Sequence, residues 1–403
     1  MQKKILVGAV AAALTIPGMA LAATNFGSGD NVVELYGKVY PEIVIPHGSG
    51  ATDAGATVAT FAGKPAGEDS IIRRTEMASS NSRLGVRGQE RLGSDLKAIF
   101  QLETEFHVDS NDSKFATRDS FVGLAGKKWG DIKIGRMDTP FKKYGDELSF
   151  FGISSGNFLS SSNVFRKTGY GTSSASSFHL RRQNAVEYET PHIAGVNAAL
   201  QYSTDETDKA GRHPHVWSGG VQWSGGPLKV ALAYEEHWDL FGGSRNAPSS
   251  MSNFSDLSVN SRDKAFSVMA QYKLGHHTFE ADWNQKKYDE NATVTGRFQE
   301  YKNNAYELKW DARWTRAWRT AIWYVKAMKG SCSRVNASCS TDGLDGSQVN
   351  VGAAYYFSPR TFIFLVGAVL RNGFSARFNN EDLQDPSVGE DITQWAIGMN
   401  HSF

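Results

Sequence analysis

The chain has 403 residues, and its 43 lysines and arginines almost balance its 42 aspartates and glutamates, giving a formal charge of +1. Such a balance argues against a nucleic-acid partner, because nucleic-acid-binding domains carry clustered excess positive charge. The 40 glycines, 11 prolines and 12% aromatic residues describe a chain rich in rings and turns. Aromatic side chains favour strands, so the composition predicts a β protein.

The first residues have the pattern of a secretory signal. Lys3 and Lys4 supply the positive start, residues 5–20 the apolar run, and Ala20-Leu21-Ala22 a small-x-small cleavage pattern. We expect residues 1–22 to be removed on export, leaving residues 23–403 as one domain. A retained anchor is the alternative, but the apolar run is short for a span of about 20 residues.

No later stretch approaches the length of about 18 apolar residues that indicates a membrane helix. The nearest candidate, residues 349–370, is interrupted by Ser358-Pro359-Arg360, a turn signal that carries a charge. Two kinds of exported protein therefore remain: a soluble one, and one that crosses a membrane as a closed barrel in which all backbone groups pair between strands.

A period of two recurs along the chain. Leu228, Val230, Leu232 and Tyr234 alternate with small or charged residues, as expected for a strand whose two faces meet different surroundings. Aromatic residues stand near the ends of many of these apolar faces, where a bilayer interface would lie. We predict about sixteen such strands. They begin near Val32, Ser82, Leu96, Arg118, Asp131, Arg182, Val196, His215, Leu228, Lys264, Thr278, Tyr301, Trp318, Gln348, Thr361 and Asp391.

The connections between these strands alternate in length, short on one side and long on the other, as in transmembrane barrels. Strands of about 10 residues also leave enough chain for eight long loops. The predicted fold class is therefore an all-β, transmembrane antiparallel β-barrel of 16 strands. The long, polar connections are residues 46–80, 109–117, 141–180, 205–214, 240–262, 289–300, 330–347 and 375–390.

Ionised side chains occupy the strand faces opposite the apolar ones. Lys38 alternates with apolar residues of the first strand, and Arg83 and Arg87 alternate with Leu84 and Val86. On a soluble sheet these charges would face bulk water. A dry barrel core could not accept so many ionised groups, because their desolvation costs too much. We therefore expect a lumen filled with water.

The longest connection, residues 141–180, shows no clear alternation and carries Asp146 and Glu147 near its start. Loops of this length are usually functional or disordered. Folded inward, this one would narrow the channel and set its carboxylates against basic residues of the wall. The resulting transverse field would orient dipolar solutes and discriminate between ions by sign. A disordered loop is the competing interpretation.

Three other patterns give weaker indications. Gly152-Ile153-Ser154-Ser155-Gly156 matches a nucleophile elbow formally, but the strand and helix that such an elbow needs are not indicated, so we interpret it as a turn. The histidines at 213, 215, 276 and 277 lack the spacing of metal ligands, and we predict no metal site.

Cys332 and Cys339 are the only cysteines, and in an exported protein they favour a disulfide. Closing this short loop would stabilise the fold by about 2.5 kcal/mol through the lost entropy of the unfolded chain. A metal site there would lack a third ligand.

At these residues the sequence resembles the general, non-specific porins of Gram-negative outer membranes, in the neisserial and related β-proteobacterial branch. The resemblance covers the whole of residues 23–403. It rests on Leu35-Tyr36-Gly37-Lys38, Ser82-Arg83-Leu84-Gly85-Val86-Arg87-Gly88, residues 96–103, Ser120-Phe121-Val122-Gly123-Leu124, Gly135-Arg136, Asn184-Ala185-Val186-Glu187-Tyr188, Pro191 and the terminal Phe403.

The resemblance implies a homotrimer in the outer membrane, in contact with lipid and lipopolysaccharide, with the third long loop folded into the pore. It also implies that Phe403 helps the insertion machinery recognise the chain. By position, Lys38, Arg83 and Arg136 match the basic wall of the family, and Asp146 and Glu147 lie where its inward loop is acidic. We add to the predicted basic wall Arg87, which alternates with apolar residues, and Arg181 and Arg182, which stand near Glu187.

Two positions depart from the pattern of the family. Strict alternation places Arg136 on the same face as Ile132 and Ile134, which are apolar. Glu187 stands where relatives often carry a basic residue. We therefore expect the basic cluster to be rearranged, and we draw no conclusion about the sign of the ion preference from the sequence.

The sequence thus predicts a passive pore for small hydrophilic solutes and ions, without a cofactor. A substrate-selective channel for sugars or organic acids is the alternative. It would need an aromatic track through the lumen, for which Tyr36, Tyr40 and Trp323 are the available pieces. A barrel enzyme such as a lipase or protease would need a serine and histidine pair at the rim, and we find no convincing one, so we expect no catalysis.

Overall fold

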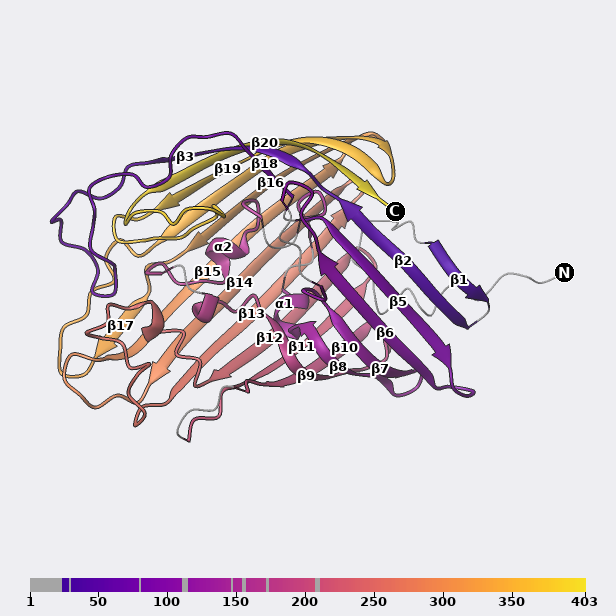
Figure 1. Cartoon of the computed structure of the whole chain (residues 1–403), viewed down its shortest axis with the longest axis horizontal. Helices are drawn as coiled ribbons and strands as arrows, with labels where there is room; N and C mark the ends of the chain where they lie inside the picture. The colour runs from indigo at the N-terminus through magenta and orange to yellow at the C-terminus, as the bar shows by residue number, and fades with distance from the viewer. Residues whose placement is uncertain are drawn as a thin grey trace.

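The chain closes into a barrel of tilted antiparallel strands (Figure 1). The computed structural model describes residues 24–28, 30–79, 81–110, 115–145, 148–153, 157–171, 174–206 and 211–403. The predicted signal, residues 1–22, lies outside these ranges. None of the helices among the described residues is long and apolar enough to cross a membrane.

The barrel has sixteen strands, the first of which is built from two consecutive segments. These segments are β2 (Asn31–Val39) and β3 (Glu42–Ser49). The other fifteen are β5 (Arg83–Arg91), β6 (Lys97–Glu105), β7 (Ser120–Gly126), β8 (Gly130–Asp138), β9 (Arg181–Glu189), β10 (Val196–Thr204), β11 (His215–Gly225), β12 (Leu228–Trp238), β13 (Ser261–Leu274), β14 (His277–Glu290), β15 (Phe298–Arg313), β16 (Trp318–Ala327), β18 (Gly346–Ser358), β19 (Thr361–Asn372) and β20 (Asp391–Ser402).

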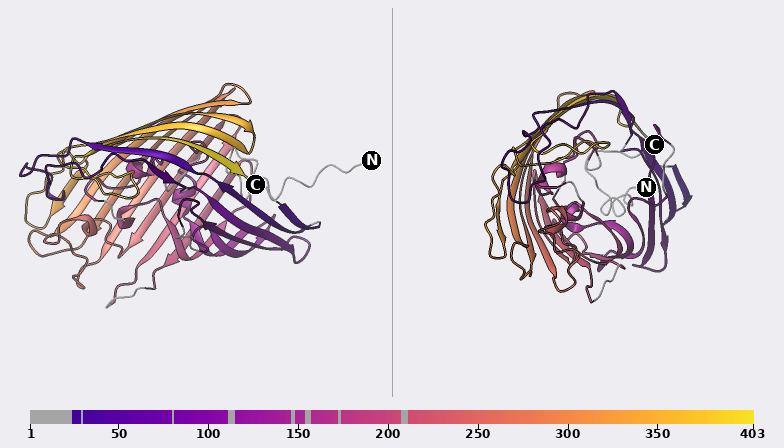
Figure 2. Two further views of the ribbon diagram at one scale, coloured as in Figure 1. Left: turned by 45° about the horizontal axis from the view of Figure 1, so that its top comes forward. Right: turned by 60° about the vertical axis from the view of Figure 1, so that its left-hand side comes forward.

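The first and last strands pair and close the barrel. β2 pairs with β5, β3 pairs with β20, and Lys38 lies opposite Ser402. The backbones of Gly37 and Phe403 exchange two hydrogen bonds of 3.0 Å, and the Phe403 ring lies where any side chain at position 37 would be. Closure removes the unpaired edges that an open sheet would present, which Figure 2 shows from the end of the barrel.

The prediction that the long loop begins at Pro46 was wrong, because the strand continues through β3 to Ser49. Proline lacks a backbone donor and is tolerated only where one strand edge is free. Beyond Val44, β3 pairs only with β20, so Pro46 meets that condition. Three short strands were also not predicted: β1 (Thr24–Ser28), β4 (Glu76–Ala78) and β17 (Ser331–Arg334).

The outer face of the barrel is apolar. Leu232 and Tyr234 expose 41% and 43% of their surface, whereas the alternating Ala231 and Ala233 are buried on the inner side. β20 repeats the pattern, since Ile397 is 57% exposed between inward-facing polar or small residues. Large apolar side chains on the outside of a soluble protein would be costly in water, so this distribution fits a barrel surrounded by lipid.

The long segment between β8 and β9, residues 139–180, folds into the barrel, and we call it the inward loop (Figure 2). It contains α1 (Pro140–Lys143), α2 (Ser162–Phe165) and the 3₁₀ turn η2 (Ser174–Ser176); another such turn, η3 (Ser244–Asn246), lies in a later loop. Inward-facing side chains of β14 and β18 donate hydrogen bonds to its backbone. Lys286 donates to the Phe165 carbonyl at 2.7 Å and Asn350 to the Leu159 carbonyl at 2.6 Å.

Two of the long loops also contact each other. Cys332 and Cys339 form a disulfide with their Cα atoms 5.8 Å apart. Next to it, Ser340 exchanges two hydrogen bonds with Thr60, of 2.9 and 2.7 Å, which tie the loop after β17 to the loop after β3. The disulfide therefore supports a contact between two loops and not the barrel wall.

Replacing both cysteines by serine should loosen these two loops and leave the barrel intact, because the bond closes a short local loop worth about 2.5 kcal/mol. Protease should cleave the segment after β17 faster in the variant, whereas the midpoint of barrel unfolding in detergent should stay the same. Reductant should reproduce the effect in the original protein and add nothing in the variant. A barrel that melts earlier without its disulfide would contradict this.

Candidate pore constriction

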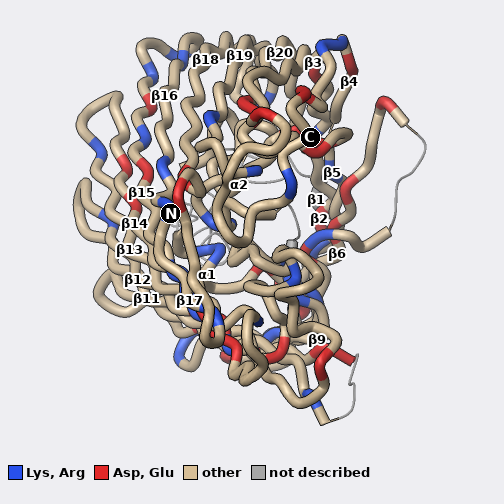
Figure 3. The backbone as a smooth tube through the Cα atoms, turned by 90° about the vertical axis from the view of Figure 1, so that its left-hand side faces the viewer, with Lys and Arg blue, Asp and Glu red and all other residues tan. Residues whose placement is uncertain are grey.

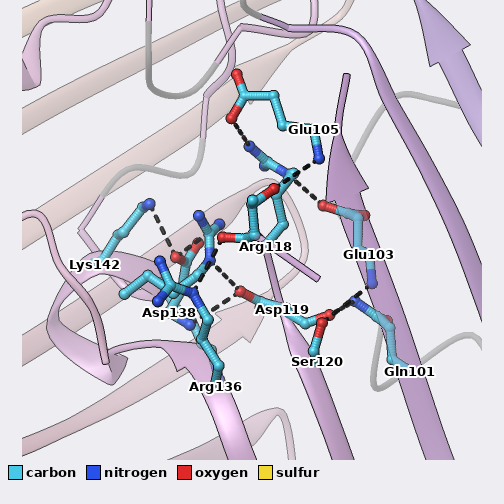
Figure 4. Close-up of polar contacts among 12 residues, drawn as sticks. Gln101, Glu103, Glu105, Arg118, Asp119, Ser120, Arg136, Asp138 and Lys142 are labelled. Carbon is cyan, nitrogen blue, oxygen red and sulfur yellow. Dashed lines mark hydrogen bonds and ion pairs between the residues drawn. The ribbon is translucent and has the colours of Figure 1, made fainter. Parts of the chain in front are cut away.

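Charged side chains from β2, from β5 to β9, from the two residues just before β7 and from the start of the inward loop meet on one side of the lumen. Figure 4 shows the centre of this group, and Figure 3 shows basic and acidic positions interspersed around α1, β6 and β9. We call this group the charged wall. Its members are Lys38, Arg83, Arg87, Glu103, Glu105, Arg118, Asp119, Lys133, Arg136, Asp138, Lys142, Lys143, Arg181, Arg182 and Glu187.

Two carboxylates at the centre of the charged wall are neutralised. Arg181 lies 2.6 Å from an Asp119 oxygen and 2.9 Å from an Asp138 oxygen. Lys142, from α1, lies 2.9 Å from the same Asp138 oxygen. Because α1 begins at a Thr139 cap whose hydroxyl accepts from the Lys142 amide, the loop enters the lumen with its lysine already aimed at the wall.

A second group of ion pairs lies beside β6. Arg118 pairs with Glu103 and lies 4.0 Å from Glu105, and Tyr36 donates to Glu103 at 3.0 Å. Arg118 comes just before β7 and was predicted only as the start of a strand. Because Arg118 precedes β7 by two residues, strand alternation gave no signal that its side chain turns into the barrel.

The expectation that strict alternation puts Arg136 on the apolar face was wrong. The pairing of β8 with β9 shifts at this point: Gly135 lies opposite Ala185, but Met137 lies opposite Arg182. One residue of β8, Arg136, therefore faces two residues of β9, Gln183 and Asn184, which is a bulge in β9. Next to it, Gly135 of β8 has φ of +151°, a backbone conformation that breaks the regular alternation of the strand. Ile132 and Ile134 remain on the outer face, 43% and 57% exposed, while Arg136 turns inward beside Asp119 and Asp138 (Figure 4).

Four of the six predicted basic residues have no carboxylate partner among the described residues, and three of these four are arginines. Arg136 donates from Nε to the Thr117 carbonyl at 3.1 Å, and Arg182 donates from Nε to the Ser203 hydroxyl at 3.2 Å. For Arg83, no hydrogen bond or ion pair exists within the described ranges, although it lies near Glu103. These three guanidinium groups keep donors for a passing solute.

The other three predicted basic residues are engaged elsewhere. Lys38 is fully buried, donates to the Gly152 carbonyl at 2.8 Å and thereby holds the inward loop. Arg87 pairs with Glu34, with a second hydrogen bond of 2.8 Å. Arg181 is paired with two carboxylates, as described above. Of the six predicted basic residues, Arg87 and Arg181 therefore pair with carboxylates, and Lys38 is bound to the inward loop.

Glu187, the acidic departure from the family pattern, is neutralised by two lysines. Lys143 of α1 lies 2.6 Å from it and Lys133 of β8 lies 3.5 Å away. Gln201 adds a hydrogen bond of 2.9 Å. Lys133 could have been found, because it alternates with two outward isoleucines. Lys143 could not, because the loop that carries it has no periodic pattern.

The predicted acidic residues of the loop, Asp146 and Glu147, lie outside the described residues, as does Ser154 of the formal nucleophile elbow. Two pieces of the hypothetical aromatic track do not line the lumen. Tyr40 and Trp323 are buried beneath the inward loop, where Tyr40 stacks on Phe364 and Trp323 packs edge-on against Phe150. Tyr36 is also buried.

A family model described as Gram-negative porin matches residues 9–375. The chain belongs to this family. It is an outer-membrane porin, and its barrel is the wall of a channel through the Gram-negative outer membrane. The resemblance read from the sequence is thereby confirmed.

Relatives of this porin come from the expected bacterial groups. Major outer membrane protein P.IB of Neisseria gonorrhoeae is 26% identical over 321 residues, which are 75% of this chain and 81% of that protein. Outer membrane porin protein 32 of Delftia acidovorans is 33% identical over 192 residues, 46% of this chain and 53% of that protein. The solved anion-selective porin from Comamonas acidovorans has a TM-score of 0.68 at 23% identity, covering 92% of this chain and 99% of the other.

The bulge at Gly135 should be essential for the charged wall. Gly135 has φ of +151°, and a Cβ there would lie 2.3 Å from the Ser120 carbonyl oxygen. Gly135→Ala should therefore lower the unfolding free energy by about 1–3 kcal/mol and change the single-channel conductance. Gly219→Ala is the matched control, since its nearest neighbour would be 3.5 Å away. Equal denaturant midpoints and conductances for both variants would show that the bulge does not need glycine.

Proposed function

We propose that this porin is a general diffusion pore for small hydrophilic solutes and ions, and that its narrowest part favours anions. The observation that carries the proposal is the unequal pairing of the charged wall. Within the described residues its carboxylates are neutralised, whereas Arg83, Arg136 and Arg182 keep guanidinium groups without an acidic partner.

Three such guanidinium groups create a positive potential where the inward loop narrows the lumen. A monovalent anion at about 4 Å from one of them gains roughly 1 kcal/mol in water and up to about 4 kcal/mol near a protein surface. The attraction is long-ranged and does not depend on solute shape, so it biases permeation by charge without selecting one substrate.

The comparisons support this choice over a substrate-selective channel. The solved porin from Comamonas acidovorans is described as anion-selective, and this chain shares its fold. The burial of Tyr40 and Trp323 beneath the inward loop removes two of the three residues from which an aromatic track for sugars could have been built. We propose, from the sequence alone, that Asp146 and Glu147 of the inward loop lie opposite the charged wall and weaken its attraction for anions.

Export and assembly form the second part of the proposal. We propose that residues 1–22 are a cleaved signal, that Phe403 marks the chain for insertion, and that the mature protein is a homotrimer in contact with lipid and lipopolysaccharide. Support for the trimer comes from a solved OmpT of Vibrio cholerae, described in a trimer form, with a TM-score of 0.64. Support for Phe403 is its backbone pairing with Gly37, which completes the last strand.

Reversal potentials in a planar bilayer under a salt gradient test the ion preference. The original protein should prefer anions, and Arg83→Gln and Arg182→Gln should each lower the anion-to-cation permeability ratio by about two- to fivefold, because each removes an unpaired positive charge. Lys329→Gln is the control, since Lys329 is exposed on a long loop and paired with Asp342.

The salt dependence of the same reversal potentials provides a second test. The anion preference should shrink between 0.1 and 1 M salt, because the screening length falls from about 10 Å to about 3 Å. Absence of stepwise conductance would refute the pore itself, and a cation preference that survives both arginine substitutions would refute only the role of the charged wall.

Asp146→Asn should act in the opposite direction to the arginine substitutions. Removing a negative charge from the inward loop should raise the anion-to-cation permeability ratio, measured in the same bilayer experiment. Glu300→Gln, on a half-buried ion pair of β15 with Lys287, provides a charge-matched control away from the loop. An unchanged ratio for Asp146→Asn would place that carboxylate away from the permeation path.

A further inference from the structure

Three carboxylates lie close together on the inner faces of β14 and β15, away from the charged wall. They are Glu280, Asp282 and Glu307, and each is buried, between 1% and 4% exposed. Asp282 and Glu307 lie directly opposite each other in the pairing of the two strands, as do Glu280 and Lys309. Like charges in directly opposite positions are destabilising, so the cluster needs a compensating cation.

Lys309 supplies only part of that compensation. Its ammonium group lies 2.8 Å from Glu280 Oε1 and 2.6 Å from Glu307 Oε1, but 3.5 Å from Asp282 Oδ2. Gln271 donates to the other oxygen of Glu280 at 2.8 Å. Three carboxylates and one ammonium group leave two negative charges in a buried space, which is costly without a further partner.

The oxygens without a hydrogen bond show where this partner belongs. Both oxygens of Asp282 and Oε2 of Glu307 are buried and accept no hydrogen bond within the described part of the chain. Asp282 is thus a buried carboxylate that lacks hydrogen-bond donors and points into a cluster of its own charge. Buried acceptors of this kind are rare in native proteins unless water or an ion binds them.

We propose that Glu280, Asp282 and Glu307 bind one divalent cation of the calcium class. One oxygen from each residue lies within 4.8 Å of the others. That spacing suits an ion held between oxygens, since Ca²⁺–oxygen bonds are about 2.3–2.6 Å long. The ligands are all carboxylate oxygens, the hard donors that Ca²⁺ and Mg²⁺ prefer, and a charge of +2 cancels the two uncompensated negative charges.

The site lies behind the inward loop and outside the path of the solute. The Leu148 amide donates to Glu280 Oε1 at 3.4 Å, and Ser161 lies beside Glu307. Trp323 covers Lys309, whose nitrogen is 4.8 Å from the ring centre. A bound ion would therefore fix two separate parts of the inward loop, near residues 148 and 161, to the same pair of strands and would hold the width of the pore constant.

Terbium luminescence offers a direct test, because Tb³⁺ replaces Ca²⁺ at oxygen sites and is excited by a nearby tryptophan. Full-length porin, stripped with a chelator, should show saturable Tb³⁺ emission that Ca²⁺ competes away. Asp282→Asn and Glu307→Gln should each lose most of this emission. Trp323→Phe should lose the emission but keep the binding of Ca²⁺ measured by equilibrium dialysis. Asp342→Asn, on an exposed loop, is the control and should behave as the original protein.

Thermal unfolding in detergent supplies a readout that does not depend on a probe. Ca²⁺ should raise the midpoint of the original protein and of Asp342→Asn, and this rise should vanish in Asp282→Asn and Glu307→Gln. Both substitutions replace a carboxylate by an amide of the same shape, so we expect these variants to fold. If one does not fold, the unfolding midpoints of the original protein with chelator and with Ca²⁺ still test the proposal.

One result would overturn the proposal. If the chelated original protein binds no Ca²⁺ beyond what Asp282→Asn binds, and its midpoint does not respond to Ca²⁺ or Mg²⁺, the two facing carboxylates share a proton instead of a metal ion. Channel recordings separate this site from the proposed pore function: a chelator should increase the open-channel noise of the original protein while its ion preference, set by the charged wall, stays unchanged.

Discussion

The whole architecture depends on the requirement that backbone donors and acceptors be paired within lipid. Water cannot satisfy them there, so a sheet that crosses the membrane must have no free edge. In this porin the requirement is met by the pairing of β3 with β20 and by the reciprocal hydrogen bonds between Gly37 and Phe403. Once the sheet is closed, the strand period of two determines which side chains face lipid and which line the interior of the barrel.

The interior is divided into a wet and a dry region by the inward loop. On one side lies the charged wall, where Arg83, Arg136 and Arg182 have no carboxylate partner among the described residues. On the other side it packs aromatic residues such as Phe150 and Phe158 against Tyr40 and Trp323. The loop is thus held by apolar packing, by Lys38 and Lys286, and on the proposal above by a cation, while the opposite wall stays free for solutes.

The sequence predicted the strands well because their signal is local. Each of the sixteen predicted strand starts lies within three residues of the first residue of a barrel strand. The largest differences are at β13, predicted to begin at Lys264 but beginning at Ser261, and at β15, predicted to begin at Tyr301 but beginning at Phe298. Three features depended on pairing between distant segments and were not predictable from period alone. The strand through Pro46 needs a free edge, the inward turn of Arg136 needs the shift between β8 and β9, and the burial of Tyr40 needs the inward loop above it.

Residues of the charged wall were likewise predictable from the sequence only where they lie on regular strands. Basic residues on regular strands, such as Arg83 and Lys133, are marked by alternation with apolar neighbours. Lys142 and Lys143 lie in a loop without a period, and their partners become visible only in three dimensions. Whether a cation is free or neutralised is also a property of the folded wall: Arg181 and Arg182 are adjacent in sequence, yet only Arg181 has carboxylate partners among the described residues.

The most direct test of the central claim is the exposure of single positions on β5 to lipid and to water. Single cysteines at Arg83, Leu84, Val86 and Arg87 can be labelled, since the two native cysteines are joined in a disulfide. In bilayers, quenchers attached to lipid chains should reach positions 84 and 86, and charged water-soluble reagents should reach positions 83 and 87. Equal access of both reagents to all four positions, or a folded protein that stays dispersed without detergent, would contradict the account.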